Sequence, residues 1–161
     1  MDLPAHALWA FALFKRYSWQ WEAVLFGMMP DLIFGIPALY YMWVTRKLPG
    51  NPKGEERYGR IFPLIEPYYR FAHSAVTMLL FFAIASLAAR APYWPLLAGW
   101  SLHILLDLPM HKGGWVQGIT PLYPISKRKV EGRWWWKEVI EKRPWLAAVN
   151  YGLALLVYFI A

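Results

Sequence analysis

The sequence predicts an all-α, polytopic membrane protein that forms a single integral membrane domain over residues 1–161. Its residues are 58% hydrophobic and only 17% charged, whereas ordinary soluble domains are about 45–50% apolar and about 25% charged. The mean hydropathy is +0.27 over the whole chain. The apolar residues gather in runs that are separated by basic stretches, the pattern of membrane helices joined by loops. These observations predict about five membrane-embedded helices.

The five expected helices follow from the lengths of the apolar runs, because a helix that crosses a bilayer needs about 20 mostly apolar residues. The runs cover residues 3–14, 21–44, 68–89, 93–110 and 145–161. The second run contains Pro30 and Pro37. Proline removes a backbone donor and clashes with the preceding helical turn. We therefore expect this helix to break near Pro30, at a place where neighbouring helices or a polar cavity satisfy the freed backbone groups.

The distribution of Lys and Arg predicts the orientation, since these residues gather in the cytoplasmic loops of membrane proteins. The loops 45–67 and 112–144, with the adjacent Arg70, hold 14 of the 17 Lys and Arg residues. We therefore expect both basic loops and the N-terminus on the cytoplasmic side of the cell membrane. The net charge of +7 then has anionic lipid head groups as its neighbours, which argues against a nucleic-acid partner.

Ionisable residues inside apolar runs are costly in a bilayer and are therefore candidate functional residues. All four His of the chain and two Asp lie inside or at the ends of these runs: His6, Asp31, His73, His103, Asp107 and His111. The chain has no Cys, so a bound metal must be held by His and carboxylate. The expected topology brings the four His and Asp107 to the cytoplasmic side, and a break at Pro30 adds Asp31. This convergence predicts a shared metal site.

The strongest local pattern is HILLDLPMH at 103–111, in which polar residues recur every four positions. At 3.6 residues per turn they share one helical face. His103 and Asp107 can then bind one ion while Asp107 and His111 reach a second, with the carboxylate as a bridge. A purely structural alternative is that Asp107 neutralises a buried His and that His111 lies at a hydrated helix end.

The other candidates have structural alternatives as well. Asp31 follows a proline and is suited to cap a helix N-terminus, because its side chain accepts from free backbone donors. His73 suits a hydrogen bond to a neighbouring helix, and His6 lies close enough to the terminus for exposure at the membrane interface. The agreement of all six positions favours the metal site over these separate explanations.

The order of these residues resembles the YdjM-like family of predicted membrane-bound, metal-dependent hydrolases, over most of the chain. The segments that carry the resemblance are GMMPD at 27–31, AHS at 72–74, HILLD at 103–107 and TPLYP at 120–124. The ligand order is also similar to that of zinc-dependent phospholipase C and the related single-strand nucleases. The resemblance implies that all six candidates are metal ligands. Ile33 and Tyr69 stand where many members of the family carry an Asp and a His, which favours one or two ions over three.

The activity that the resemblance implies is metal-assisted hydrolysis, with zinc favoured by a ligand set rich in His and free of Cys. A site inside a membrane implies an amphiphilic substrate that arrives from the lipid, and by analogy a phosphodiester is the leading candidate. Asp107 is then the central catalytic residue. Arg70, one turn before His73, is a candidate phosphate clamp, although an arginine that binds lipid head groups explains the same position.

A function without hydrolysis is the alternative. Four His on apolar helices also suit the haem of a membrane electron carrier, or a path for metal transport. Haem gives no role to Asp31 and Asp107, and a transporter usually spreads its polar residues through the membrane. A structural protein without chemistry leaves the two Asp residues unexplained.

Overall fold

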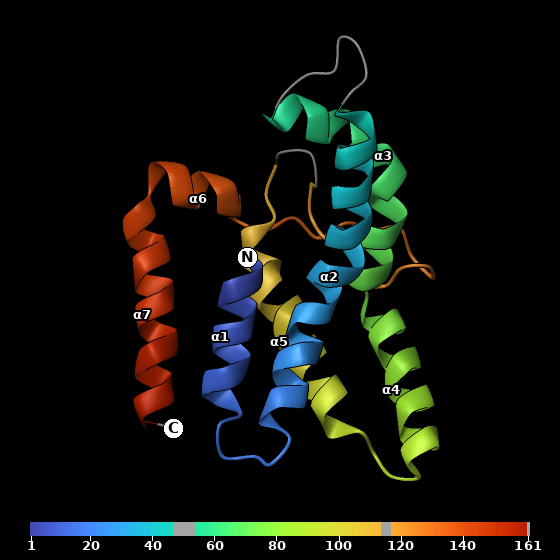
Figure 1. Cartoon of the computed structure of the whole chain (residues 1–161), viewed down its shortest axis with the longest axis vertical. Coiled ribbons are helices and arrows are strands. Elements are labelled where there is room, and N and C mark those ends of the chain that lie inside the picture. Colours follow the sequence, from blue (N-terminus) through green and yellow to red (C-terminus); the bar gives the residue numbers. More distant parts are fainter. Residues whose placement is uncertain (47–53, 114–116, 161) are drawn as a thin grey trace.

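The computed structural model describes residues 1–46, 54–113 and 117–160, and it confirms the all-α class within them (Figure 1). No β-strand is formed in these ranges, which contain only two isolated β-bridges. The elements in chain order are α1 (Leu3–Leu13), α2 (Gln20–Thr45), α3 (Gly54–Ala72), α4 (Ala75–Ala89), α5 (Trp94–Asp107), the short 3₁₀ helix η1 (Leu108–Met110), α6 (Trp136–Lys142) and α7 (Pro144–Ile160).

Among the described residues, α2 alone is both long and apolar enough to cross a membrane as a single helix. Two bent pairs also qualify if each pair counts as one span. Glu56–Ala72 joins α4 at an angle of 56°, and α6 joins α7 at an angle of 110°. By length and composition the described chain therefore has one membrane span, or up to three, and the five expected helices do not each qualify.

The expected break near Pro30 is wrong, because α2 continues without interruption through Pro30 and Asp31. Pro30 is fully buried, and the neighbouring helix α5 supplies a hydrogen-bond partner in the same turn. Nδ1 of His103 lies 2.7 Å from the carbonyl oxygen of Gly27. This contact joins the turn before Pro30 to α5.

A close backbone contact joins α2 to α5. A Cβ atom added at Gly99 of α5 would lie 2.2 Å from the carbonyl oxygen of Ala23 and 2.8 Å from the backbone nitrogen of Gly27. Small residues at helix interfaces let two backbones approach in this way. The contact places His103, one turn after Gly99, against α2 beside the turn that carries Asp31.

The first basic loop is shorter than expected, because residues 54–67 form most of α3. This helix is amphipathic, with Ile61, Ile65 and Tyr69 buried at intervals of four residues, the spacing of one helical face. The expected helix over 68–89 is accordingly divided into the end of α3 and the whole of α4. Residues 47–53 of the first loop and 114–116 of the second lie outside the described residues.

Ser74 organises the break between α3 and α4. Its Oγ accepts from two backbone N–H groups in the first turn of α4, as an N-cap does, and donates to the carbonyl oxygen of Tyr123. The backbone nitrogen of Ala75 also donates to the carbonyl oxygen of Pro121, at 2.8 Å. The second basic loop therefore returns to this break and fixes the position of His73.

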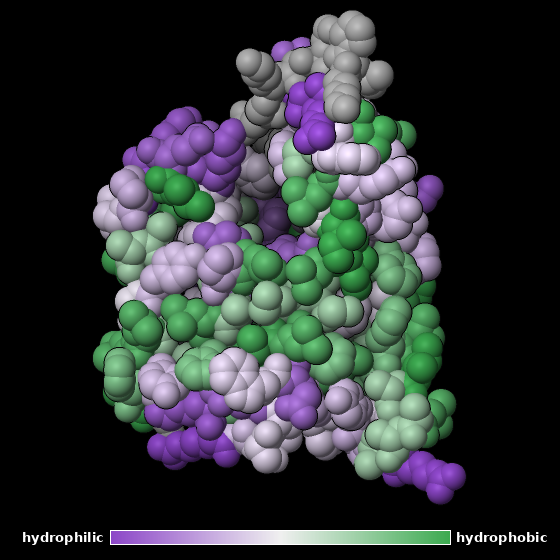
Figure 2. All heavy atoms as spheres, viewed as in Figure 1, coloured by the Kyte–Doolittle hydropathy of each residue, from purple (hydrophilic) through white to green (hydrophobic). Residues whose placement is uncertain are grey.

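One face of the molecule is apolar in the middle and hydrophilic toward both ends. Figure 2 shows hydrophobic side chains in a band across one face, between hydrophilic side chains at α6 and at the opposite end of the bundle. Leu80 on α4, Leu105 on α5 and Leu156 on α7 are each more than half exposed. Exposed apolar side chains on several helices are consistent with membrane association.

Candidate metal centre

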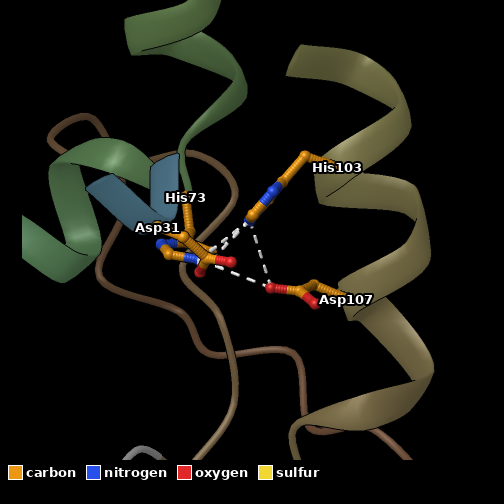
Figure 3. Close-up of side chains that lie close together, drawn as sticks. All are labelled: Asp31, His73, His103 and Asp107. Atoms are coloured by element: carbon orange, nitrogen blue, oxygen red, sulfur yellow. Dashed lines mark hydrogen bonds and ion pairs between the residues drawn. The ribbon is translucent and has the colours of Figure 1, made fainter. Parts of the chain in front are cut away.

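Four predicted ligands, Asp31, His73, His103 and Asp107, point toward one another inside the bundle (Figure 3). Asp31 comes from α2, His73 from the break between α3 and α4, and the other two from adjacent turns of α5. One ligand atom of each residue lies within 4.8 Å of the ligand atoms of the others. His73, His103 and Asp107 are almost completely buried, so this polar group stands in the interior and not on a solvated surface.

Backbone carbonyls orient both imidazole rings. Nδ1 of His103 lies 2.7 Å from the carbonyl oxygen of Gly27, and Nδ1 of His73 lies 3.0 Å from that of Tyr69. A carbonyl oxygen only accepts, so each Nδ1 carries a proton and each Nε2 of the neutral ring presents a lone pair. Metal-binding His residues in proteins are usually oriented by this second hydrogen bond.

The two Nε2 atoms face each other and the Asp107 carboxylate. They are 3.2 Å apart, and Oδ2 of Asp107 lies 3.4 Å from the Nε2 of His73 and 3.3 Å from that of His103. In the described part of the chain no group donates a hydrogen bond to this Oδ2. Three lone pairs with no proton between them repel one another, so the arrangement favours a bound cation.

The distances between the ligand atoms fit a zinc ion. Ligand atoms placed tetrahedrally around zinc, with bonds of about 2.0–2.1 Å, lie about 3.3 Å from one another. Asp31 is farther out, with Oδ1 at 3.9 Å from the Nε2 atoms of both His73 and His103 and with 22% of its side chain exposed. The centre therefore consists of three closely set ligands and a fourth on its more open side.

His6 is not one of these four residues and approaches the centre through Asp107. Its Nε2 lies 3.0 Å from Oδ1 of Asp107 and 4.0 Å from Asp31, and its ring stacks on that of His103 with centroids 3.7 Å apart. The amino group of Met1 also donates to Oδ1 of Asp107. The two carboxylate oxygens of Asp107 thus have different surroundings, since Oδ2 faces the centre and Oδ1 is held from the side.

His111 also lies beside Asp107 and outside the group of four. Its Nδ1 is 3.0 Å from the backbone carbonyl oxygen of Asp107 and 3.7 Å from its Oδ2. Burial lowers the pKa of His111 to about 4, against the opposing effect of the Asp107 carboxylate. The imidazole is therefore neutral at pH 7, the form that binds metals.

Arg70, the predicted phosphate clamp, is paired with a carboxylate of its own helix. Its Nε and Nη2 donate to Oε1 of Glu66 at 3.1 and 2.6 Å. Lys129 approaches the same oxygen at 3.8 Å. The role of Arg70 in phosphate binding stays a prediction.

A pocket of about 290 Å³ adjoins the centre and includes residues that sequence reasoning did not assign to the site. Asp31 and His111 line it together with Tyr69 of α3 and Trp136 of α6. The corresponding face is hollowed between α6 and the upper part of α2 (Figure 2). The spacing of four residues between Tyr69 and His73, which places both on one helical face, is the sequence signal that points to Tyr69.

No family model, curated protein or solved structure matches the chain. The assignment of the site therefore rests on its geometry, and the resemblance to the YdjM-like family stays a prediction.

Proposed function

We propose that the protein is a membrane-embedded, metal-dependent hydrolase that acts on a phosphodiester or related ester of an amphiphilic, lipid-like substrate. The observation that carries this proposal is the convergence of two imidazole nitrogens and one carboxylate oxygen. The Nε2 atoms of His73 and His103 and Oδ2 of Asp107 lie 3.2–3.4 Å from one another. Both Nδ1 protons are directed away from the centre, to backbone carbonyls.

The donor set fits zinc, in one or two ions, since imidazole nitrogens and carboxylate oxygens are common ligands of this metal. A bound zinc ion lowers the pKa of a coordinated water to about 7 and polarises an ester oxygen. Haem fits the site less well, because Nε2 atoms 3.2 Å apart leave no space for a porphyrin plane between them.

Each residue of the centre has a separate role. His73 and His103 supply neutral nitrogen ligands in fixed orientations. Asp107 supplies the negative charge that offsets the cation, and its contacts with His6 and Met1 fix the plane of the carboxylate. Asp31 completes the ligand set from the side of the pocket. A role for Arg70 as phosphate clamp requires its guanidinium to leave Glu66.

We place this site in the cell membrane, with the multi-pass arrangement and the cytoplasmic N-terminus that the sequence predicts. The helices that we propose to be membrane-embedded are α1, α2, α4, α5 and α7. The exposed apolar side chains on α4, α5 and α7 support this arrangement. A site among membrane-embedded helices receives its substrate from the lipid, which favours an amphiphilic substrate.

The test is hydrolysis of bis-p-nitrophenyl phosphate, a phosphodiester reporter, by protein purified in detergent and loaded with zinc. We expect activity that a chelator removes and zinc restores. Asp107→Asn should abolish it, because the change removes the charge and one ligand oxygen at nearly constant volume. Glu22→Gln is the matched control, since Glu22 is exposed in the first turn of α2. Equal activity of wild type and Asp107→Asn, or a wild type without stoichiometric metal, would contradict the proposal.

A further inference from the structure

We propose that the 290 Å³ pocket beside the metal centre, which we call the donor pocket, binds the oxygens of a phosphoryl group. The hydroxyl of Tyr69 and the indole N–H of Trp136 are its hydrogen-bond donors. The inference rests on the proposed function and deepens it, since it names the group of the substrate that the site recognises. Two buried donors without acceptors support it, together with the basic pocket beside them.

The phenol of Tyr69 is buried, rigid and without a hydrogen-bond acceptor. The side chain is 3% exposed, and within residues 1–46, 54–113 and 117–160 nothing forms a hydrogen bond with its hydroxyl. The ring stacks on His73, with centroids 4.2 Å apart, and meets Phe34 edge-on at 5.3 Å. A phenol is protonated at neutral pH and can donate. Tyr69 therefore presents a fixed donor next to a ligand of the metal centre.

Trp136 brings a second donor from a different element. It is 7% exposed and packs with Ala5 and Val139 in a small apolar cluster. Its Nε1 has no acceptor among the described residues. Tyr69 and Trp136 line the donor pocket from α3 and α6. The two donors thus belong to separate parts of the fold that meet at this pocket.

Two unsatisfied donors on residues that line one pocket indicate a ligand that is rich in acceptor oxygens. A buried donor without an acceptor destabilises a folded protein, and such groups are rare unless a ligand, ion or water satisfies them. A phosphoryl group offers several oxygens in a tetrahedral arrangement. One oxygen can therefore face the metal centre while others accept from Tyr69 and Trp136.

The basic pocket next to the donor pocket favours an anion. The donor pocket itself is lined by Lys137 and by the carboxylates of Asp31 and Glu141, and Lys137 lies 3.8 Å from Glu141. Lys137 also lines a second pocket of about 840 Å³. The lining of the second pocket contains five basic and two acidic side chains: Lys112, Arg133, Lys137, Lys142, Arg143, Glu138 and Glu141. Phe34 and Ile140 add apolar surface to the donor pocket. This combination suits a phosphoryl group that is attached to an apolar chain.

The experiment measures binding of inorganic phosphate to the zinc-loaded protein in detergent by calorimetry. Loss of one hydrogen bond should raise the dissociation constant of phosphate about fivefold to tenfold in Tyr69→Phe, and Trp136→Phe should act in the same direction. The zinc affinity of Tyr69→Phe should stay at the wild-type value, since the phenol is not a ligand. Tyr93→Phe is the control, because Tyr93 contacts Phe26 and lies outside both pockets.

A second arm compares inorganic phosphate with dihexanoyl phosphatidic acid, which carries the same group on a short lipid. Tighter binding of the lipid, weakened equally by Tyr69→Phe, would assign the pocket to a lipid head group. Tighter binding of inorganic phosphate would assign it to a free phosphate. Unchanged phosphate affinity in a folded Tyr69→Phe would overturn the inference and leave the hydrolase proposal standing. Absence of zinc from the wild type would instead contradict the hydrolase proposal.

Discussion

The Nδ1 proton of His103 determines what its other nitrogen can do. That proton is donated from α5 to the carbonyl oxygen of Gly27 in α2. Nε2 therefore carries a lone pair, which is directed at His73 and Asp107. His73 is oriented in the same way by its own helix, through the carbonyl oxygen of Tyr69. The two rings are therefore fixed as ligands before any metal arrives, which lowers the entropic cost of binding one.

The two kinds of His in the site should respond differently to truncation. His103→Ala removes a ligand atom and should weaken zinc binding by at least about 100-fold. His6→Ala removes a side chain that acts on Oδ1 of Asp107, and losses of such supporting groups cost about 10–100-fold, so we expect the lower end of that range. Competition with a chromogenic zinc chelator gives both values. Equal losses would show that His6 is itself a principal ligand.

At the residue scale, the members of the site were predictable and their roles were not. His73, His103, Asp31 and Asp107 were identified because ionisable residues are costly in apolar helices. The donation of the His103 Nδ1 to the carbonyl of Gly27 depends on how α2 packs against α5, which no local pattern encodes. Tyr69 does not stand out in the sequence, because tyrosines are common at membrane interfaces, where they need no functional explanation.

At the element scale, helix positions followed from apolar runs, while breaks depended on tertiary partners. The expected helix over 93–110 corresponds to α5 and η1, because the run is apolar throughout. The break expected at Pro30 does not occur, because the penalty for proline is a local rule, whereas Pro30 is fully buried by tertiary packing. The break at His73 cannot be predicted locally. The carbonyls of Pro121 and Tyr123, which accept hydrogen bonds from the residues after His73, lie far away in the sequence.

The contact between α2 and α5 should be the most sensitive helix interface. Gly99→Ala places a methyl group 2.2 Å from the carbonyl oxygen of Ala23, so the helices must separate. We expect a loss of about 1–3 kcal/mol in unfolding free energy, as for other overpacked sites, together with weaker zinc binding because His103 moves with α5. Thermal unfolding and zinc titration in detergent measure the two effects.

Gly152→Ala on α7 is the matched control, because nothing lies within 4 Å of a Cβ at that position. It should keep wild-type zinc affinity and gain a little stability, since alanine favours helix over glycine. If Gly99→Ala behaved like this control, the close contact would not be what positions the centre.

At the scale of the whole molecule, the connection between α1 and α2 lies at the end of the bundle opposite α6 (Figure 1). The second basic loop contains α6, and the N-terminus lies below α6 in this view. The positive-inside rule predicts that the end of the bundle that carries α6 faces the cytoplasm. The metal centre lies beside the N-terminus, because Met1 contacts Asp107.

Cysteine labelling tests this orientation cleanly, since the chain has no Cys of its own. In intact spheroplasts a membrane-impermeant maleimide should label Arg16→Cys, whose native side chain is exposed on the connection between α1 and α2. The same reagent should reach Lys127→Cys, in the second basic loop, only after the membrane is opened. Labelling of both positions from outside would contradict the proposed topology.

The most direct test of the metal centre is X-ray absorption at the zinc edge of the loaded wild-type protein. We expect about four nitrogen or oxygen neighbours at about 2.0–2.1 Å, with the multiple-scattering signature of two imidazoles. His73→Ala and His103→Ala should each remove one imidazole from that signature. A spectrum without imidazole scattering, or one that neither substitution changes, would show that His73 and His103 do not bind the metal.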